Sequence, residues 1–242
     1  MILWAAESAA AVISVSEALR QSMIRLGMDG TKIATLRNGV DLGAFRPMDR
    51  AAIRRRIGLD GPVLLTVGNI LESKGQGIVV EALAKLPRTI LLIVGSGPDE
   101  GRVRDIAKKL GVQDRVRFIG PVAHASLSDY YNAADAMVLA TAREGWPNVV
   151  LESLACGTPV VATNVGGVPE IITAGVAGRL LPERTSAAVA DTVRELLAQP
   201  PSRADVRGHA EKYSWDEVTA QQLALFARAV SGRERGPSSS FR

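Results

Sequence analysis

The sequence predicts a doubly wound α/β domain built on a parallel sheet and followed by C-terminal helices. From residue 62 onward, six apolar, β-rich runs alternate with helical patterns, which is the order of βα units in a parallel sheet. The runs are nearly all apolar, as in strands that helices cover on both faces. The composition is 47% hydrophobic but only 4% aromatic. The core must therefore be built from Ala, Val, Leu and Ile.

Each predicted strand ends in a short segment that can turn into a helix. The predicted strands cover residues 62–69, 89–97, 115–120, 136–142, 159–167 and 178–183. The predicted helices lie near residues 77–86, 100–110, 126–134, 148–156, 169–174 and 186–199. Sheets of this kind bind ligands at the carboxyl ends of their strands. The loops that follow the strands are therefore the places to look for a site.

The two flanks differ from this central domain, which we place at residues 37–199. Residues 1–36 contain one strand pattern, "AAVISVS", and one helix pattern. Such a pair cannot bury its own apolar faces, so it either packs on the main domain or is the end of another domain. Residues 200–232 begin with Pro-Pro and continue with two helical patterns. Residues 233–242 have the composition of a disordered tail.

Positive charge is concentrated in one segment. The net charge is +4, and residues 28–56 hold seven basic side chains and three Asp. This predicts a solvated surface, or alternatively a patch for an anionic partner such as a membrane surface. We expect no nucleic-acid binding, because the sequence has no aromatic platform, zinc spacing or recognition-helix pattern.

Other residue types predict little chemistry. Cys156 is the only cysteine, so no intrachain disulfide can form, and we expect a packed small side chain rather than a nucleophile. His124 and His209 are interpreted as surface or cap residues. We expect no metal site. No run reaches the ~18 apolar residues of a membrane helix, and the start lacks the basic region of a signal peptide. These features predict a cytoplasmic location, with contact at the inner membrane face as the alternative.

Two strand-end loops suit a phosphate ligand. The helix expected after Pro147 has no acid in residues 147–151, so the backbone N–H groups of Asn148 and Val149 are available to an anion. Lys74 lies in "GNILESKGQG", at the end of the first strand, and supplies a cation there. It is not part of a P-loop, because no glycine precedes it and no Ser or Thr follows it.

The glycines of "GSGPDEG" do not form a dinucleotide fingerprint. Their spacing is G-x-G-x-x-x-G, and Asp99 and Glu100 at the following helix start would repel a phosphate. Gly95 and Gly97 are expected to allow a tight turn and close packing instead.

Glu144 and Glu152 stand eight positions apart in "REGWPNVVLESLACGTPVVAT". A helical rise over eight residues is roughly 12 Å, comparable to a ligand with two hydroxyl-bearing rings joined by a diphosphate. Carboxylates accept hydrogen bonds from vicinal hydroxyls. The pattern suggests a nucleotide-sugar site in which Glu152 holds the ribose and Glu144 the transferred sugar. A helix residue that faces solvent or forms a salt bridge is the alternative for Glu152.

The sequence resembles the retaining glycosyltransferases of group 1, family 4, which have the GT-B fold. The resemblance covers about residues 10–230 and rests on an ordered set of motifs: "VISVSEALRQSMIRLG", "LRNGVD", "VGNILESKG", "IVGSGPDEGRVRDIAKKLG", "VRFIGPV", "YYNAADAMVLAT", "EGWPNVVLESLACGTPVVAT", "GGVPEII" and "YSWDEV". It implies the second, Rossmann-like half of a GT-B enzyme, which binds the donor, with residues 1–36 as the end of the acceptor-binding domain.

The resemblance also implies roles for individual residues. Glu152 binds ribose hydroxyls, Glu144 binds and positions the donor sugar, and Lys74 binds the phosphates. The base lies against the loop after the third strand, around Ile119 and Val122.

One position departs from the family pattern. Asn69 stands where members commonly carry Arg, so neutralisation of the phosphates depends more on Lys74. Arg143 is a candidate to supply the positive charge that Asn69 lacks.

The implied reaction is transfer of a hexose-type sugar from a nucleoside diphosphate sugar to a glycan or lipid acceptor, with retention and without a metal or other cofactor. Polysaccharide or glycolipid synthesis is the expected setting. The loop "GPVAHAS" has no carboxylate to pair with guanine, which favours a UDP-sugar over a GDP-sugar. Two alternatives stay open: a nucleotide-sugar-binding module without turnover, and a GT-B nucleotide-sugar epimerase.

Overall fold

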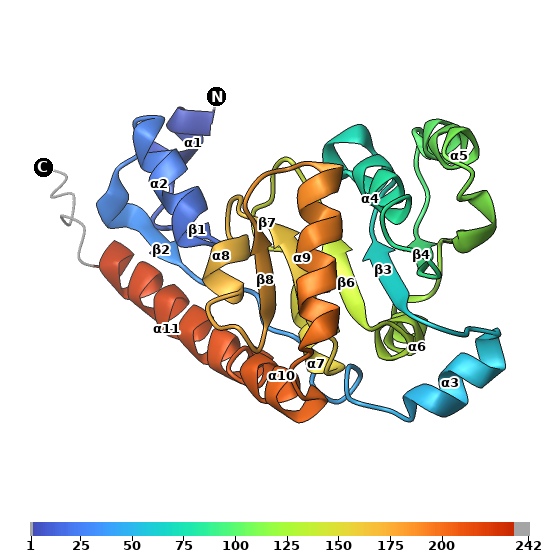
Figure 1. The fold of residues 1–242 in the computed structure, drawn as a ribbon. Helices are drawn as coiled ribbons and strands as arrows, with labels where there is room; N and C mark the ends of the chain where they lie inside the picture. The colour runs from blue at the N-terminus through green and yellow to red at the C-terminus, as the bar shows by residue number, and fades with distance from the viewer. Residues whose placement is uncertain (1, 235–242) are drawn as a thin grey trace, which may run out of the picture.

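A six-stranded sheet forms the centre of the computed structural model, which describes residues 2–234 (Figure 1). Its strand order is β5-β4-β3-β6-β7-β8, and every pairing within it is parallel. The strands are β3 (Val63–Val67), β4 (Ile90–Val94), β5 (Val116–Gly120), β6 (Ala136–Leu139), β7 (Val160–Thr163) and β8 (Gly178–Leu181). The predicted doubly wound parallel fold is confirmed.

Helices cover both faces of this sheet. One face carries α4 (Gln76–Leu83), α5 (Glu100–Lys109) and α9 (Ser186–Ala198), and the other carries α3 (Arg50–Ile57), α6 (Leu127–Ala133), α7 (Asn148–Ala155) and α10 (Arg203–Ala210). The short helix α8 (Val168–Ile171) follows β7. Successive strand residues point to opposite faces, so Leu64 joins the core beside α4 whereas Val63 and Leu65 join the core beside α7.

All six observed strands are shorter than predicted, and after β3 and β4 closely packed glycine loops take the place of the predicted strand ends. Gly95 follows β4 with a φ of +126°, and a Cβ there would lie 2.1 Å from the carbonyl oxygen of Gly68. Only glycine lets the loops after β3 and β4 approach so closely. The interpretation of Gly95 as a packing glycine, rather than part of a dinucleotide site, agrees with this contact.

The N-terminal segment contains more structure than the predicted strand and helix. It comprises α1 (Ile2–Ser8), β1 (Val12–Ser14), α2 (Glu17–Arg25) and β2 (Ile33–Thr35), and β1 pairs with β2 in parallel. The segment packs on the main domain through Glu170, whose carboxylate accepts hydrogen bonds from the backbone N–H groups of Glu17 (3.1 Å) and Ala18 (3.0 Å).

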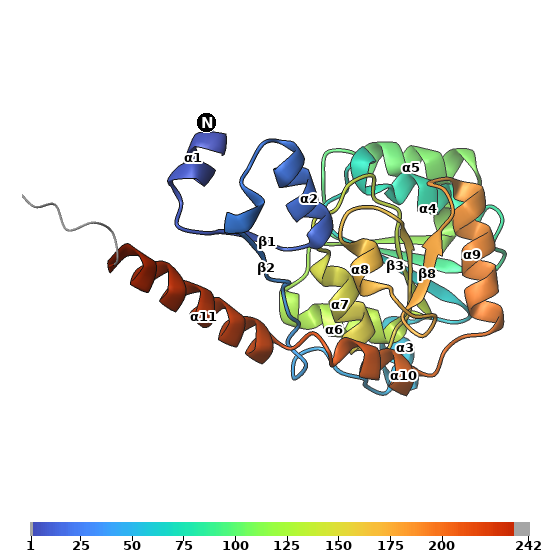
Figure 2. The ribbon, with the colours of Figure 1, turned by 90° about the vertical axis from the view of Figure 1, so that its left-hand side faces the viewer.

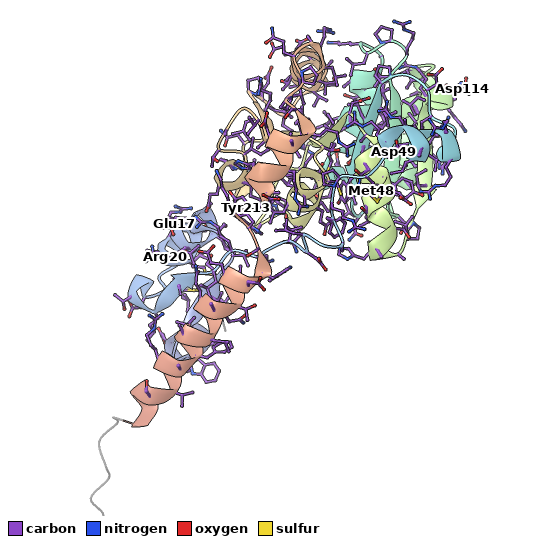
Figure 3. The ribbon with its side chains drawn as sticks, turned by 90° about the horizontal axis from the view of Figure 1, so that it is seen from below. Glu17, Arg20, Met48, Asp49, Asp114 and Tyr213 are labelled. Carbon is purple, nitrogen blue, oxygen red and sulfur yellow. The ribbon has the colours of Figure 1, made fainter. Side chains whose placement is uncertain are left out.

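The last helix, α11 (Trp215–Glu234), projects from the main domain on the same side as the N-terminal segment (Figure 2). Figure 3 places Tyr213 where this helix leaves the domain. The apolar side chains of α11 are partly open: Leu223 is 62% exposed and Phe226 49%, whereas Val218 and Leu225 are half-buried. Of the predicted tail, residues 233–234 end α11 and residues 235–242 lie outside the described part of the chain.

Most of the basic side chains in residues 28–56 are paired within the chain. Arg50 and Arg54 both bind Asp135. Arg56 binds Asp129, Arg37 binds Glu170, and Lys32 donates to the carbonyl oxygen of Glu7. These pairs tie the segment to the domain, so its charge is not presented as one open basic surface. None of the described helices is long and apolar enough to span a membrane.

Candidate functional site

A groove lies where the strand order reverses. From β3 the chain moves outward to β4 and β5, and from β6 it moves the other way to β7 and β8. The carboxyl ends of β3 and β6 therefore flank the switch point, where open α/β sheets bind their ligands. The groove has a volume of about 320 Å³, and its lining comprises Thr66, Val67, Gly68, Asn69, Lys74, Gln76, Leu139, Glu144, Trp146, Pro147, Asn148 and Val149.

Five of the nine residues proposed from the sequence meet in this groove: Asn69, Lys74, Glu144, Asn148 and Val149. They come from the loops after β3 and β6 and from the start of α7.

The other four residues lie outside the groove lining. Arg143 is exposed, and within residues 2–234 its side chain forms no hydrogen bond or salt bridge. Ile119 and Val122 are half-buried against the core beside α7, and Glu152 lies within α7.

Lys74 and Glu144 form an ion pair across the groove. The distance from Lys74 Nζ to Glu144 Oε2 is 2.8 Å, with the side chains 32% and 18% exposed. The loop that carries Glu144 is held by Gly166, because a Cβ there would lie only 1.6 Å from the Glu144 carbonyl oxygen. An ammonium group has three donors, so Lys74 can hold Glu144 and still bind a phosphate.

The start of α7 offers donors to the same groove. Within residues 2–234, the backbone N–H groups of Asn148 and Val149 have no protein acceptor, while that of Val150 donates to the carbonyl oxygen of Pro147 at 3.0 Å. No acid occupies the first turn. Free N–H groups and the positive end of the helix dipole favour an anion there, beside Lys74.

Glu144 and Glu152 are not joined by one continuous helix. The helix begins at Asn148, so only the four steps from residue 148 to residue 152 have a helical rise, about 6 Å in all. Pro147 and the residues before it form a turn, and the estimate of roughly 12 Å for the whole interval was wrong in assuming one continuous helix. The two carboxylates belong to different settings rather than to one helix face.

Glu152 is neither solvent-facing nor free. It is 7% exposed, and its carboxylate accepts hydrogen bonds from Tyr131 Oη at 2.7 Å and from His124 Nε2 at 2.9 Å. A buried carboxylate without partners would be costly, so these two groups explain how α7 tolerates an acid among apolar neighbours.

The prediction for the two histidines was half wrong. His124 has an exposed side chain, as expected. His209 is 4% exposed and its Nε2 lies 2.7 Å from the carbonyl oxygen of Ile171, because α10 packs against the face of the sheet that also holds α7. Cys156 is buried, and burial, the main cause, raises the pKa of its thiol to about 11. This setting fits a packed side chain rather than a nucleophile.

Two residues of the site were not found from the sequence. Gln76 is 2% exposed and lines the groove, and its Nε2 donates to the carbonyl oxygen of Asn69 at 3.0 Å, which fixes the loop after β3. The backbone carbonyl oxygen of Asn38 accepts a hydrogen bond from Trp146 Nε1 at 3.0 Å, and the side-chain Nδ2 of Asn38 donates to Asn148 Oδ1 at 3.2 Å. The glycines around Gln76 are the one sequence feature that could have indicated its place in the groove. No sequence pattern places Asn38 beside α7.

A larger hollow, about 510 Å³, lies at the opposite end of the sheet beside Arg50, Arg54 and Asp135. These charges bind one another, and the hollow faces the amino ends of β3, β6 and β7. The groove at the carboxyl ends is therefore the better candidate site. Residues 2–234 contain no group of three or more His, Cys, Asp or Glu side chains placed to hold a metal ion.

The family described as Glycosyl transferases group 1 matches residues 49–213 of this chain. The chain belongs to that family. The match covers all six strands of the central sheet and both loops that form the groove. It confirms the resemblance stated from the motifs.

Relatives and solved structures agree with membership of the glycosyl transferases group 1 family. The D-inositol 3-phosphate glycosyltransferase of Mycobacterium leprae is 38% identical over 90% of this chain and 54% of that protein. Sucrose-phosphate synthase from Thermosynechococcus elongatus superposes with a TM-score of 0.85 at 28% identity, covering 92% of this chain and 59% of the other.

Anabaena HepE, solved in complex with UDP and glucose, has a TM-score of 0.84 at 22% identity, over 90% of this chain and 63% of HepE. This last likeness shows the fold alone. The chain spans about half the length of the relatives it matches.

Proposed function

We infer that this chain is the donor-binding half of a glycosyltransferase that moves a hexose-type sugar from a nucleoside diphosphate sugar to a glycan or lipid acceptor, with retention. The observation that carries the proposal is the groove at the switch point. There a lysine, two free backbone N–H groups and a carboxylate converge. A diphosphate needs the first two, and a sugar hydroxyl needs the third.

The chain's own residues suggest how such a ligand would be held. Lys74 and the N-terminus of α7 would bind the diphosphate and stabilise its charge as the sugar leaves. Glu144 would accept a hydrogen bond from the sugar while Lys74 keeps its carboxylate in place. Glu152 would accept a ribose hydroxyl, and the base would lie near Ile119 and Val122. No step in this account requires a metal or another cofactor.

UDP-sugars are the favoured donors. The loop after β5 carries no carboxylate in residues 120–126, so guanine N–H groups would lack their best acceptor there. The printed descriptions of two similar proteins fit a sugar donor: one relative is a D-inositol 3-phosphate glycosyltransferase, and HepE was solved with UDP-glucose. We place the activity in the cytoplasm, in polysaccharide or glycolipid synthesis, with the inner membrane face as a further location.

Calorimetric titration of the chain with UDP and GDP tests the proposal. We expect saturable binding of UDP, weaker binding of GDP, and loss of UDP affinity in Lys74→Ala but not in Lys109→Ala, which removes an exposed lysine at the end of α5. The absence of any nucleoside diphosphate binding would overturn it.

A binding module without turnover is the second candidate, because the groove contains donor-binding groups and the chain spans about half the length of its relatives. Release of glucose or UDP from UDP-glucose by the chain would exclude the module. Conversion to another UDP-sugar would instead indicate an epimerase.

A further inference from the structure

The carboxylate of Glu152 is held by two side chains with very different exposure. Tyr131 is completely buried and donates its hydroxyl to Oε2, at 2.7 Å. His124 has a side chain that is 69% exposed, and its Nε2 lies 2.9 Å from Oε1. The two carboxylate oxygens therefore differ: Oε2 is bonded by a buried donor, and Oε1 by an exposed one.

Tyr131 is a permanent donor. Burial, and next the Glu152 carboxylate, raise the pKa of Tyr131 well above its ordinary value of 10.0, so the phenol keeps its proton. Its ring packs edge-on against Phe45, with ring centroids 5.9 Å apart. Both contacts fix the hydroxyl, and through it the plane of the Glu152 carboxylate.

His124 is a removable donor. Apart from Glu152, its ring rests on Phe45, at a centroid distance of 5.1 Å, and otherwise faces outward. A carboxylate oxygen only accepts hydrogen bonds, so the Nε2 atom of His124 is the donor in this pair. A ligand hydroxyl that approaches Oε1 would compete with an exposed partner rather than a buried one.

We propose that Tyr131 is a positioning residue for Glu152, and that His124 occupies the place on Oε1 that a ribose hydroxyl takes, so that the two residues set the preference for ribonucleotides over their deoxy analogues. This inference rests on the proposed function, in which Glu152 contacts the ribose. Sites built to bond a hydroxyl reject ligands that lack it, because the site's polar group is left unpaired. Here His124 can remain hydrogen-bonded to Oε1 when the ligand lacks the hydroxyl, which reduces the loss of affinity for the deoxy analogue.

The two residues should therefore act on the preference in opposite directions. Without the Tyr131 hydroxyl, the carboxylate is free to turn, and the ribonucleotide loses affinity while the deoxy analogue does not. Without His124, the ribonucleotide no longer has to displace a donor and binds more tightly, while the deoxy analogue again is unaffected. A purely structural role for either residue would change both affinities together.

The test is calorimetric titration with UDP or GDP, whichever the wild-type chain binds more tightly, and with its 2′,3′-dideoxy analogue. We expect a ratio of dissociation constants of about tenfold or more in the wild type, as for one lost charge-assisted hydrogen bond. Tyr131→Phe should bring the ratio to about one to threefold, and His124→Ala should raise it by roughly threefold.

Tyr130→Phe is the matched control, since Tyr130 is the neighbouring residue of α6 and its hydroxyl makes no hydrogen bond within residues 2–234. It should leave the ratio unchanged. An unchanged ratio in Tyr131→Phe, or an unchanged or lower ratio in His124→Ala, would overturn the inference. His124→Ala alters an exposed side chain, so it can still overturn the inference if Tyr131→Phe does not fold.

Failure of the inference can be told apart from failure of the proposed function. If the wild type binds the ribonucleotide and its dideoxy analogue equally, this inference and the ribose contact of Glu152 are wrong, while the proposed binding of a nucleoside diphosphate sugar in the groove stands. If the wild type binds no nucleoside diphosphate, both are wrong.

Discussion

Glu144 and Glu152 belong to one motif but lie in opposite surroundings. Glu144 sits in a turn, opens into the groove and pairs with the ammonium group of Lys74. Glu152 sits in the middle of α7, is 7% exposed, and takes its hydrogen bonds from a phenol and an imidazole. A carboxylate beside a cation suits a charged reaction centre, whereas a buried carboxylate held by a phenol and an imidazole suits the recognition of hydroxyls.

The largest effect should come from breaking the pair at Glu144. Lys74→Ala removes the cation from the groove and leaves the Glu144 charge to repel a diphosphate. We expect the affinity for UDP to fall roughly thirtyfold, about 2 kcal/mol. Titration of UDP against this variant and against Lys109→Ala measures the difference. Equal loss in both variants would mean that Lys74 does not face the ligand.

Neutral variants of the two acids should separate their roles. Glu152→Gln should weaken UDP and UDP-glucose alike, by roughly tenfold, because both ligands carry the ribose. Glu144→Gln should weaken UDP-glucose by a similar factor and leave UDP nearly unchanged. Competition titrations with the two ligands give both ratios. Identical patterns in the two variants would contradict the difference drawn between the two carboxylates.

The sequence predicted the strands, the helices and the site residues at strand ends better than it predicted contacts between distant segments. Six strands and their helices follow from apolar runs and turn residues, and the positions of Lys74 and Asn148 at strand ends follow from that order. The short strand β2 and the hydrogen bonds of Asn38 depend on contacts between distant segments. No local pattern encodes those contacts.

Burial was the other quantity that the sequence did not supply. Glu152 and His209 are polar side chains whose partners, Tyr131 and the carbonyl group of Ile171, come from other elements. A polar residue in an apolar pattern signals either a satisfied buried group or a ligand contact. Only the packed structure shows which partners are present.

A third acid, Glu170, extends the comparison to the N-terminal segment. Partial burial alone would raise its pKa, but hydrogen bonds from Ala18, Arg37 and Glu17 outweigh burial and hold the pKa below its ordinary value of 4.5. Because the pKa is lowered on folding, this contribution to stability is present above about pH 4.5 and is lost as the pH falls through the lower, folded-state pKa.

Glu170→Gln should therefore lower the Tm at pH 7, by about 2–4 °C if the carboxylate contributes about 1 kcal/mol. The gap between variant and wild type should close as the pH falls below 4.5 and through the lower, folded-state pKa of Glu170. Thermal unfolding measured at pH 7 and at acidic pH gives the difference in Tm between variant and wild type at each pH. A difference that does not depend on pH would exclude the charge of the carboxylate as its cause.

The smallest effect is expected at Arg143, the neighbour of Glu144. It is exposed and does not line the groove, so Arg143→Ala should change the affinity for UDP by no more than about twofold. The sequence suggested that it compensates for Asn69. A loss as large as that of Lys74→Ala would restore that role.

Mapping the bound ligand by NMR tests the location of the site most directly. UDP is titrated into isotope-labelled chain and the backbone amide signals are followed. The account predicts saturable shifts that are largest for Asn148 and Val149, whose free N–H groups would meet the diphosphate, and for the loop that carries Lys74. No saturable shift, or shifts centred on Arg50 and Arg54 at the opposite end of the sheet, would contradict it.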